Sequence, residues 1–373
     1  MKLAVDVETI ISNKGNPFDI TNKLVLGGTY DGESYCMFDS ASIDLSNNLL
    51  VGFNFKFDLH WLQRLGIPLN NIQVWDCQLA EFLISRQMDS FADLDSTAEK
   101  YGLGNKIHSI KEKYWDQGID TDQIPYDELK EYLERDLKLT YELQEVQESI
   151  LKENPKLFRL FRLQCMDLLV LQEMEWNGIL LDVERCDVEA KLLEKRITEI
   201  QDQLKDFFGN YDINYGSTDQ LSAILYGGSI TFEWRVPIGV YKTGKKTGQV
   251  RNQVLRKTEE FPRLVEPIKG SELQKEGTWS TSETVLRQLK AKKSVRPILN
   301  AIIELGELEK LYSAYLIGFP KKIVEMNWEN NFIHGQFNQC NAITGRLSAS
   351  NPNQQNLAAD FKKCMVTRYK ERI

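Results

Sequence analysis

The stretch KLAVDVET at residues 2–9 decides how the N-terminal part of this chain folds. Its side chains alternate, so that Leu3 and the two valines share one face whereas Asp6 and Glu8 share the other. A period of two residues is typical of a β-strand, and the apolar face indicates that one side of the strand is buried. The two carboxylates therefore point to the same side of a sheet. A D-x-E pair is also common on solvated strands, so this pair indicates a functional site only if other acidic residues of the chain lie near it.

The segments that follow predict an α/β fold. Residues 23–30 and 34–39 read as two more strands, and residues 48–54 read as a short apolar strand that runs into a helical pattern ended by Gly66. A helix-forming stretch over residues 125–150 begins with a proline, which suits a first helical turn. Consecutive strands followed by alternating strands and helices predict a layered α/β domain.

Two further polar pairs lie four residues apart, which places each pair on one face of a helix. Asn54 and Asp58 stand at the start of the first predicted helix, and Tyr132 and Asp136 lie within the stretch 125–150. Both pairs also have a purely structural explanation. Asn54 suits an N-cap, and Asp58 is a favourable partner of the helix dipole. The second pair equally suits a surface helix whose aromatic side chain packs on the sheet.

Taken together, these acids indicate a metal site. The four carboxylates would repel one another strongly if they met without a cation; they belong to Asp6, Glu8, Asp58 and Asp136. Carboxylate oxygens favour Mg²⁺ or Mn²⁺ over softer metals. Two such ions about 4 Å apart stabilise both the attacking and the leaving oxygen of a phosphoryl displacement. The three histidines are scattered along the sequence, which argues against a histidine-based zinc site.

The order of the motifs DVE, NFKFD and YLERD resembles the DEDD superfamily of 3′–5′ exonucleases, in the subtype with tyrosine in the last motif. The resemblance implies an RNase H-like domain in which the four acids hold two Mg²⁺ or Mn²⁺ ions. It implies that Tyr132 orients the attacking water, and that Asn54 contacts the bound strand or orders Asp58. An accidental match and an inactive site are the alternatives.

The distribution of charge divides the chain into two parts. Residues 1–150 hold 13 basic and 26 acidic residues, whereas residues 151–373 hold 33 basic and 28 acidic ones. Acidic clusters suit metal ions and basic stretches suit a polyanion. A basic stretch at 241–263 lies in an insertion at 227–281 that reads as a hairpin or a mobile loop. We expect it to contact nucleic-acid phosphates through Lys242, Lys245, Lys246 and Arg251.

Three segments of the second part are similar to family A DNA polymerases. Residues 174–182 (MEWNGILLD) resemble the junction that precedes the thumb, and residues 214–226 (NYGSTDQLSAILY) resemble a thumb segment. The most specific segment, NAITGRLSASNPNQQN at 341–356, is similar to the family motif TGRLSS-x-x-PNLQN. Bacteriophage members, in which the thumb carries a basic insertion of this kind, look most similar.

The third segment also makes physical sense as a DNA contact. Arg346 offers five hydrogen-bond donors, which suit the acceptors that every base pair presents in the minor groove. Asn353, Gln355 and Asn356 add short amide groups nearby. Such contacts are largely independent of base sequence, as replication requires. The alternative is a polar turn around Pro352.

The resemblance implies an exonuclease domain at 1–150, a mostly helical thumb at 151–325 that contains the insertion at 227–281, and the start of an α+β palm at 326–373. The palm run D-[YF]-S-x-[IL]-E and the fingers helix do not occur in these 373 residues. We therefore expect 3′–5′ exonuclease activity and primer–template binding, but no polymerisation by this chain alone. We also expect the strand edge at 331–340 to need a partner from a separate fragment that carries the rest of the palm and the fingers.

Composition sets the remaining expectations. Hydrophobic residues make up 42% and charged residues 27% of the chain, ordinary values for a globular protein. The apolar runs are far shorter than the roughly 18 residues of a membrane span. The six cysteines form no C-x-x-C pair, so we expect reduced thiols in a cytoplasmic protein. A single-stranded DNA 3′ end and a primer–template are the expected partners, with a processivity factor as a further candidate. A free-standing 3′–5′ exonuclease and a non-catalytic DNA-binding subunit are the alternative functions.

Overall fold

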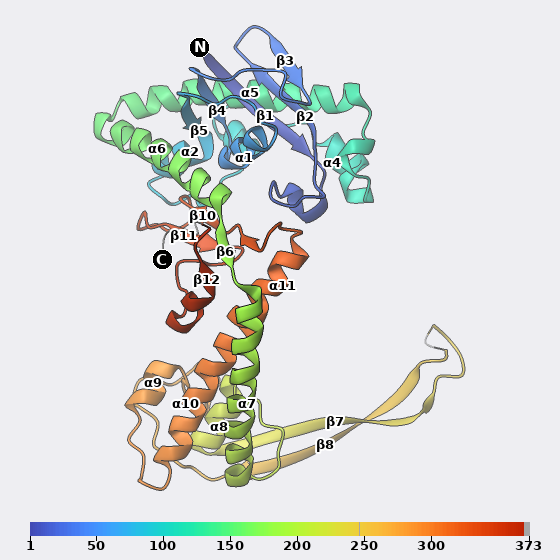
Figure 1. The fold of residues 1–373 in the computed structure, drawn as a ribbon, viewed down its shortest axis with the longest axis vertical. Helices are drawn as coiled ribbons and strands as arrows, with labels where there is room; N and C mark the ends of the chain where they lie inside the picture. Colours follow the sequence, from blue (N-terminus) through green and yellow to red (C-terminus); the bar gives the residue numbers. More distant parts are fainter. Residues whose placement is uncertain (246, 369–373) are drawn as a thin grey trace. The chain divides into compact units, whose positions relative to one another are not determined.

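The computed structural model describes residues 1–245 and 247–368 (Figure 1). The chain forms two compact units, one made of Met1–Val183 together with the stretch that begins at Phe319, and the other of Glu184–Gly318. The elements of the first unit are β1 (Lys2–Thr9), η1 (Ser12–Gly15), β2 (Leu24–Tyr30), β3 (Tyr35–Phe38), β4 (Leu49–Gly52), α1 (Lys56–Arg64), β5 (Gln73–Asp76), α2 (Cys77–Ile84), α3 (Leu94–Lys100), α4 (Ser109–Lys113), η2 (Trp115–Gln117), η3 (Thr121–Gln123), α5 (Tyr126–Lys152), α6 (Pro155–Asn177), β6 (Ile179–Leu181), α11 (Gly318–Glu325), β9 (Phe332–Ile333), β10 (Gln336–Asn338), β11 (Ser348–Ser350), η5 (Ala359–Cys364) and β12 (Met365–Val366).

A five-stranded sheet in the order β3-β2-β1-β4-β5 forms the centre of the first unit. β1 is antiparallel to β2 and parallel to β4, and β4 is parallel to β5. The predicted α/β class, the first three strands and the fourth strand are confirmed. β5 was not predicted, because four residues between a turn and a helix are too few to show a periodic pattern.

Helices pack on both faces of this sheet. Figure 1 shows α5 running across it, and Leu133 and Leu137 of α5 belong to one buried cluster with Ala4 and Leu26 of the sheet. Leu3 and the two valines of β1 belong instead to a cluster with residues of α1, α2 and α6. Since Asp6 and Glu8 alternate with those apolar residues, they project from the face that α5 covers.

The long helix α6 is part of the first unit, although it lies beyond residue 150. It begins after Asn154, whose side chain accepts a hydrogen bond from the Leu157 N–H at 3.2 Å. Phe161 and Cys165 are buried in the same core as the central sheet. The two compact units therefore do not coincide with the three regions expected from the sequence, at 1–150, 151–325 and 326–373.

The strands that follow α11 are short and all have partners within the chain. β9 pairs with β6, which also pairs with β12, and β10 pairs with β11. β6, at the end of α6, pairs with Phe332–Ile333, while the motif at 341–356 folds back and pairs with Gln336–Asn338. β9 and β10 nevertheless stand at the edges of their sheets, so each keeps one open side, and pairing of this edge with a separate fragment stays a prediction.

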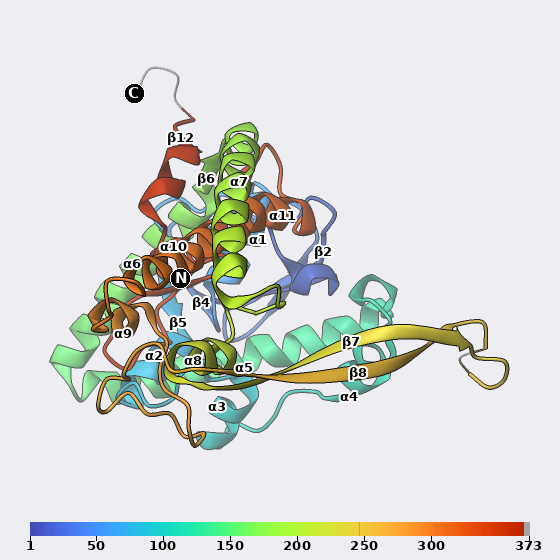
Figure 2. The ribbon, with the colours of Figure 1, turned by 90° about the horizontal axis from the view of Figure 1, so that it is seen from below.

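The second unit is a helical body with a long hairpin. Its elements are α7 (Val183–Phe208), α8 (Thr218–Tyr226), β7 (Gly228–Val240), β8 (Val250–Phe261), α9 (Glu283–Gln288), α10 (Arg296–Lys310) and the π-helix η4 (Leu311–Ile317). Leu204, Leu225, Leu299 and Leu305 are fully buried in its core. β7 and β8 form the hairpin that was one of two expectations for the insertion (Figure 2). Most of its side chains are exposed. Among the described residues, no helix is both long and apolar enough to span a bilayer.

Candidate active site

Three acids from the central sheet and the helix above it come together. Asp6 and Glu8 of β1 and Asp136 of α5 each offer a carboxylate oxygen, and these oxygens lie within 4.8 Å of one another. The strand alternation supplies the first two, and the packing of α5 on the same face of the sheet supplies the third. The structure therefore brings together residues that are 128 to 130 positions apart in the sequence.

The fourth acid, Asp58, reaches the group from α1. Its Oδ1 accepts a hydrogen bond from the Val7 N–H at 3.2 Å, and Val7 lies between Asp6 and Glu8 on β1. Asp58 is buried, with 3% of its surface exposed. All four acids that the sequence singled out are therefore neighbours on β1, α1 and α5.

The pKa values of these acids show that their negative charges are unfavourable without a cation. Burial, together with the charge of Asp136, raises the pKa of Asp6 to about 7. Burial and the charge of Asp6 likewise raise the pKa of Glu8 and of Asp58 well above their usual values. The Oδ1 atom of Asp136 is buried without any hydrogen-bond partner among the described residues. An oxygen-rich site of this kind fits a hard divalent ion, which would both neutralise the acids and satisfy that oxygen.

Tyr132 lies one helical turn before Asp136 on α5, and its ring packs on the sheet. The ring is buried among apolar residues of α5 and the sheet and meets Trp115 edge to face at 5.7 Å. Burial and the charges of Asp136 and Glu8 raise the pKa of Tyr132, so the group stays a hydroxyl at neutral pH.

Asn54 stands at the opening of this site and is not an N-cap. The N-cap of α1 is Phe55, whose N–H donates to Asp76 Oδ2 at 2.9 Å. Asn54 has a φ of +55°, which only a few side chains tolerate well, asparagine among them. Its exposed amide lines a pocket of about 350 Å³ together with Asp6 and Asp136.

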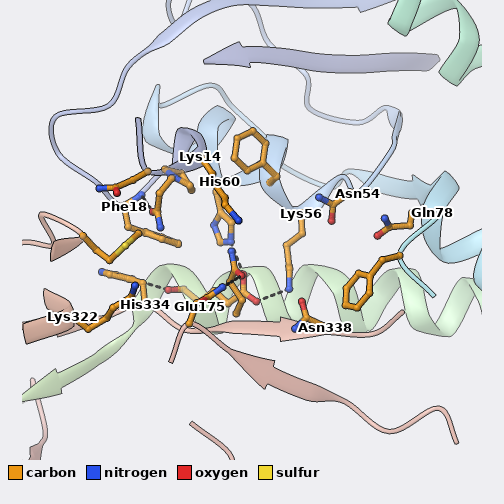
Figure 3. Close-up of a pocket in the computed structure, with 18 residues that line it drawn as sticks. Lys14, Phe18, Asn54, Lys56, His60, Gln78, Glu175, Lys322, His334 and Asn338 are labelled. Atoms are coloured by element: carbon orange, nitrogen blue, oxygen red, sulfur yellow. Dashed lines mark hydrogen bonds and ion pairs between the residues drawn. The ribbon is translucent and has the colours of Figure 1, made fainter. Parts of the chain in front are cut away.

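A larger pocket of about 560 Å³ adjoins the first, and Asn54, Gln78 and Phe91 line both. In Figure 3, Asn54 and Gln78 lie at one end of the larger pocket, while Lys14 and Lys322 lie toward the other. Neither lysine has an ion-pair partner within the part of the chain that the structure describes. The acidic site thus continues into a polar pocket with free positive charge.

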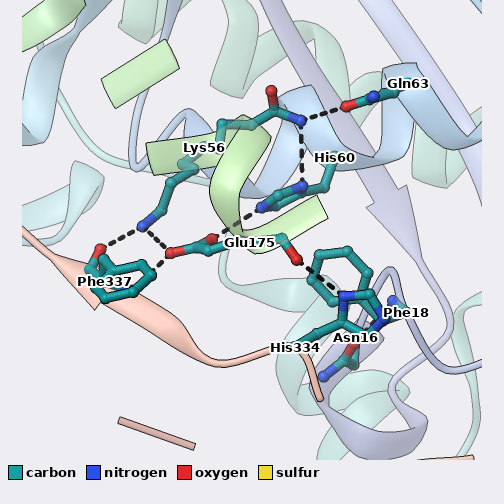
Figure 4. Close-up of polar contacts among 9 residues, drawn as sticks. Asn16, Phe18, Lys56, His60, Gln63, Glu175, His334 and Phe337 are labelled. Atoms are coloured by element: carbon teal, nitrogen blue, oxygen red, sulfur yellow. Dashed lines mark hydrogen bonds and ion pairs between the residues drawn. The ribbon is translucent and has the colours of Figure 1, made fainter. Parts of the chain in front are cut away.

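One residue that lines this pocket, Glu175, has a buried carboxylate that contacts two residues of α1, the helix that carries Asp58 (Figure 4). Glu175 of α6 accepts hydrogen bonds from Lys56 Nζ at 2.5 Å and from the Phe337 N–H at 2.6 Å, and its Oε2 lies 2.9 Å from His60 Nε2. Lys56 and His60 flank Asp58 on α1. Sequence reasoning did not find this network, because its partners come from three segments that are distant in the chain.

Lys106 is the other functional candidate that sequence reasoning missed. It lies in the loop between α3 and α4, and its Nζ forms an ion pair with Asp136 Oδ2. No periodic pattern surrounds it, since the segment GLGNK is irregular. The one hint in the sequence is that Lys106 follows a short segment with two glycines.

The expected DNA contacts lie in two other places. Arg346 precedes β11 in the first unit, and Asn353 and Gln355 follow it; all three are exposed. Asn356 is also on the surface. The remaining contacts belong to the hairpin of the second unit, where Lys242, Lys245 and Arg251 are exposed and Lys246 lies outside the described residues. None of the described side chains among them takes part in the acidic cluster.

Comparison with known families assigns both parts of the chain. Residues 40–152, which contain Asn54, Asp58, Tyr132 and Asp136, match the family of 3′–5′ exonucleases. Residues 261–372, which contain Arg346, match DNA polymerase family A. The chain is a relative of the family A DNA polymerases. Exonuclease domains of this family depend on metal ions, and both families bind DNA.

Similar proteins come from bacteria and from a phage. The chain is 29% identical over 317 residues to DNA polymerase I of Pseudomonas aeruginosa, a match that covers 83% of this chain and 29% of that protein. It is 28% identical over 305 residues to DNA polymerase I of Bacillus subtilis, covering 82% and 29%. It is 27% identical over 320 residues to the DNA polymerase of Bacillus phage SP01, covering 82% and 33%. The chain thus spans about a third of the length of these polymerases.

A solved structure shares the fold of this family A relative. It is described as the POL domain of Pol1 from M. smegmatis in complex with DNA primer-template and dNTP. The TM-score is 0.67 at 17% sequence identity, and the match covers 98% of this chain and 54% of that chain. This likeness establishes the architecture of the polymerase-like part together with that of the exonuclease-like part.

Proposed function

We propose that the acidic site removes nucleotides from the 3′ end of a DNA strand, with two Mg²⁺ or Mn²⁺ ions held by Asp6, Glu8, Asp58 and Asp136. The observation that carries this proposal is the gathering of three carboxylates beside the unpartnered Oδ1 of Asp136. Bound divalent ions would activate a water and stabilise the charge of the reacting phosphodiester. The match of residues 40–152 to 3′–5′ exonucleases supports the reaction class.

The residues around the acids have separate tasks. Tyr132, one helical turn before Asp136 on α5, stays protonated, and its hydroxyl orients the attacking water by a hydrogen bond. Asn54 has its amide at the pocket opening and no hydrogen bond to Asp58, which favours the role of strand contact over that of ordering Asp58. Glu175 acts through α1, because it holds Lys56 and His60 on either side of Asp58.

The upstream nucleotides of the strand would occupy the larger pocket. Its lysines suit phosphates, and its asparagine and glutamine side chains suit base edges. Phe91 lines both pockets, is 52% exposed and has a φ of +55°, an unfavourable backbone conformation for an aromatic residue. An exposed aromatic ring at this junction suits stacking on a base.

The decisive experiment is digestion of a 3′-labelled single-stranded oligonucleotide in Mg²⁺ by the 373-residue chain and by Asp6→Asn and Asp136→Asn. Loss of digestion in both variants, with unchanged folding by circular dichroism, is expected because each substitution removes a metal ligand. Glu33→Gln, an exposed acid on the turn before β3, is the matched control and should digest normally. Equal rates in all four proteins would exclude the site.

We further propose that the second part of the chain binds primer–template during DNA replication in the cytoplasm. The match of residues 261–372 to polymerase family A and the exposed Arg346 support this. Polymerisation would then depend on palm and fingers residues supplied by further polypeptide, in the same or a separate chain. A processivity factor that engages the basic hairpin of β7 and β8 is part of the same proposal.

A further inference from the structure

A lysine is built into the acidic site. The Nζ of Lys106 forms an ion pair with Asp136 Oδ2 and lies 5.1 Å from the centre of the Tyr132 ring. The Lys106 side chain is 25% exposed, while that of Asp136 is only 2% exposed. Lys106 also lines the pocket that contains Asp6 and Asp136. It therefore occupies one side of the carboxylate whose other oxygen has no partner.

The loop that carries Lys106 is held in place on both sides. Arg135, the neighbour of Asp136 on α5, donates to the Asn105 carbonyl at 2.9 Å and to the Leu103 carbonyl at 3.3 Å. On the α3 side, Asp95 Oδ1 accepts from the Lys106 N–H at 2.6 Å. Two charged side chains thus fix the backbone immediately before and at Lys106. A surface lysine that met Asp136 by chance would not have such support.

Gly104 makes this clamp possible. Its φ of +92° lies in the region that favours glycine, and a Cβ atom there would lie 2.7 Å from Arg135 Nη2. Any side chain at this position would strain the loop and displace the arginine. Gly104 therefore allows the loop backbone to place Lys106 beside the acids.

Lys106 carries a charge at neutral pH. An ammonium group is the ordinary form of a lysine at that pH, and this one pairs with the Asp136 carboxylate. The four neighbouring carboxylates thus have a fixed cation beside them. The ammonium group relieves part of their repulsion in the metal-free protein, and it does so at the same carboxylate that a divalent ion needs.

We propose that Lys106 is a resident cation of the exonuclease site, which holds Asp136 in the absence of a divalent ion and competes with that ion for Asp136. This inference rests on the proposed metal-dependent function. It makes Lys106 a positioning residue: it keeps the acids assembled and sets how tightly metal binds. A weak metal site is useful to an exonuclease whose ions must leave with, or rearrange around, each departing nucleotide.

The test is Mn²⁺ binding by isothermal titration calorimetry, without DNA, to the full chain and to Lys106→Met. Methionine keeps much of the side-chain volume and removes the charge. We expect Mn²⁺ to bind about tenfold more tightly to the variant, the scale of losing one partly buried charge contact. In EDTA, we expect its unfolding midpoint to fall by about 3 °C. Adding saturating Mn²⁺ should remove this difference.

Lys113→Met is the matched control. Lys113 pairs with Glu128 at 2.8 Å and lies 4.9 Å from the centre of the Tyr114 ring, so it repeats the contacts of Lys106 on the surface, away from the acids. Its removal should leave Mn²⁺ affinity unchanged. Gly104→Ala is a second test that alters no charge; loosening the clamp should also tighten Mn²⁺ binding, by roughly threefold.

The results separate this inference from the proposed function. If the unmodified chain binds no Mn²⁺, the proposed metal site is wrong and the inference is wrong with it. If the unmodified chain binds Mn²⁺ but Lys106→Met and Gly104→Ala bind it equally or less tightly, only the role of Lys106 is overturned. In an Asp136→Asn background, the stability effect of Lys106→Met should vanish; a persistent effect would show that Lys106 acts elsewhere.

Discussion

Asp6 of β1 stands directly opposite Gly28 of β2 in the antiparallel register. A Cβ atom on Gly28 would lie 2.7 Å from Leu137 Cδ1 and 3.1 Å from Leu133 Cδ2, both on α5. The missing side chain therefore lets α5 approach the sheet at the level of Asp6. Because Asp136 is the residue next to Leu137, the glycine on one strand sets the depth at which the acids of strand and helix meet.

Substituting Gly28 should disturb both stability and metal binding. We expect Gly28→Val to lower the free energy of unfolding by about 1–3 kcal/mol, as overpacking does, and to weaken Mn²⁺ binding because α5 is pushed outward. Urea denaturation and calorimetry measure the two effects. Gly306→Ala in α10, where an added Cβ meets nothing, is the control and should be neutral or slightly stabilising. A Gly28→Val protein with normal metal affinity would contradict this account of the site.

Removing the Tyr132 hydroxyl should slow the reaction without removing the metals. Tyr132→Phe is expected to reduce the single-turnover rate of 3′ digestion roughly 10- to 1000-fold, the range for losing one positioning contact. Calorimetric Mn²⁺ affinity should stay almost the same, because tyrosine is not a ligand. Tyr126→Phe, an exposed position at the start of the same helix, serves as the control. Loss of metal binding in Tyr132→Phe would contradict the assigned role.

The metal-free protein should lose stability as the pH rises through the acid range. The folded-state pKa of Asp6 is raised from 3.8 to about 7, so between those values the folded protein binds more protons than the unfolded chain. Stability therefore falls as pH increases across that window and is lowest above it. Thermal melts in EDTA between pH 4.5 and 8 should show this fall, and Asp6→Asn should flatten it. Saturating Mg²⁺ should reverse the trend above pH 7; an identical profile with and without the ion would argue against metal at these acids.

Breaking the buried network at Glu175 should destabilise the first unit. Glu175→Ala leaves the Phe337 N–H without its acceptor and leaves Lys56 Nζ with the Phe337 carbonyl but no carboxylate; such a loss from a buried pair typically costs about 3–5 kcal/mol. Glu173→Ala, exposed on the same helix, should stay within about 0.5 kcal/mol of the unmodified chain. Chemical denaturation followed by tryptophan fluorescence measures both. Exonuclease activity of the folded fraction should also drop, since α1 carries Asp58.

Arg346→Ala should affect duplex binding and spare the exonuclease. We expect a loss of about 1–3 kcal/mol in primer–template affinity, measured by fluorescence anisotropy at fixed salt. Digestion of a short single strand should be unchanged, because Arg346 takes no part in the acidic cluster. Arg159→Ala, an exposed arginine on α6, is the comparison. Equal losses for both variants would mean that binding follows net charge alone and not the motif around Arg346.

The four acids and Tyr132 were accessible from the sequence because each lies in a short motif whose spacing fixes its direction. A two-residue period points Asp6 and Glu8 to one side, and a four-residue spacing aligns Tyr132 with Asp136. Other parts of the site have no such local pattern. Lys106 lies in an irregular loop, and Glu175 meets His60 across 115 positions of sequence.

The same distinction explains what sequence reasoning missed in the fold. The pairing of residues 331–340 within the chain was not predicted because β6 and β11 are each three residues long, too short for their pairing to show in a periodic pattern. The N-cap alternative for Asn54 failed because Asp76, eighteen residues beyond Asp58, receives the Phe55 N–H instead. Local spacing predicted directions well, whereas contacts between segments that are distant in the chain required the structure.

The inclusion of α6 in the first unit determines where the exonuclease can be cut out as an independent module. A fragment that ends near residue 152 would expose the core surface against which Phe161, Cys165 and Leu168 pack. It would also leave Lys56 and His60 without the carboxylate of Glu175. Protein engineers who transfer the acidic site to another protein would need to carry α6 and the strand at Gln336–Asn338 along with it.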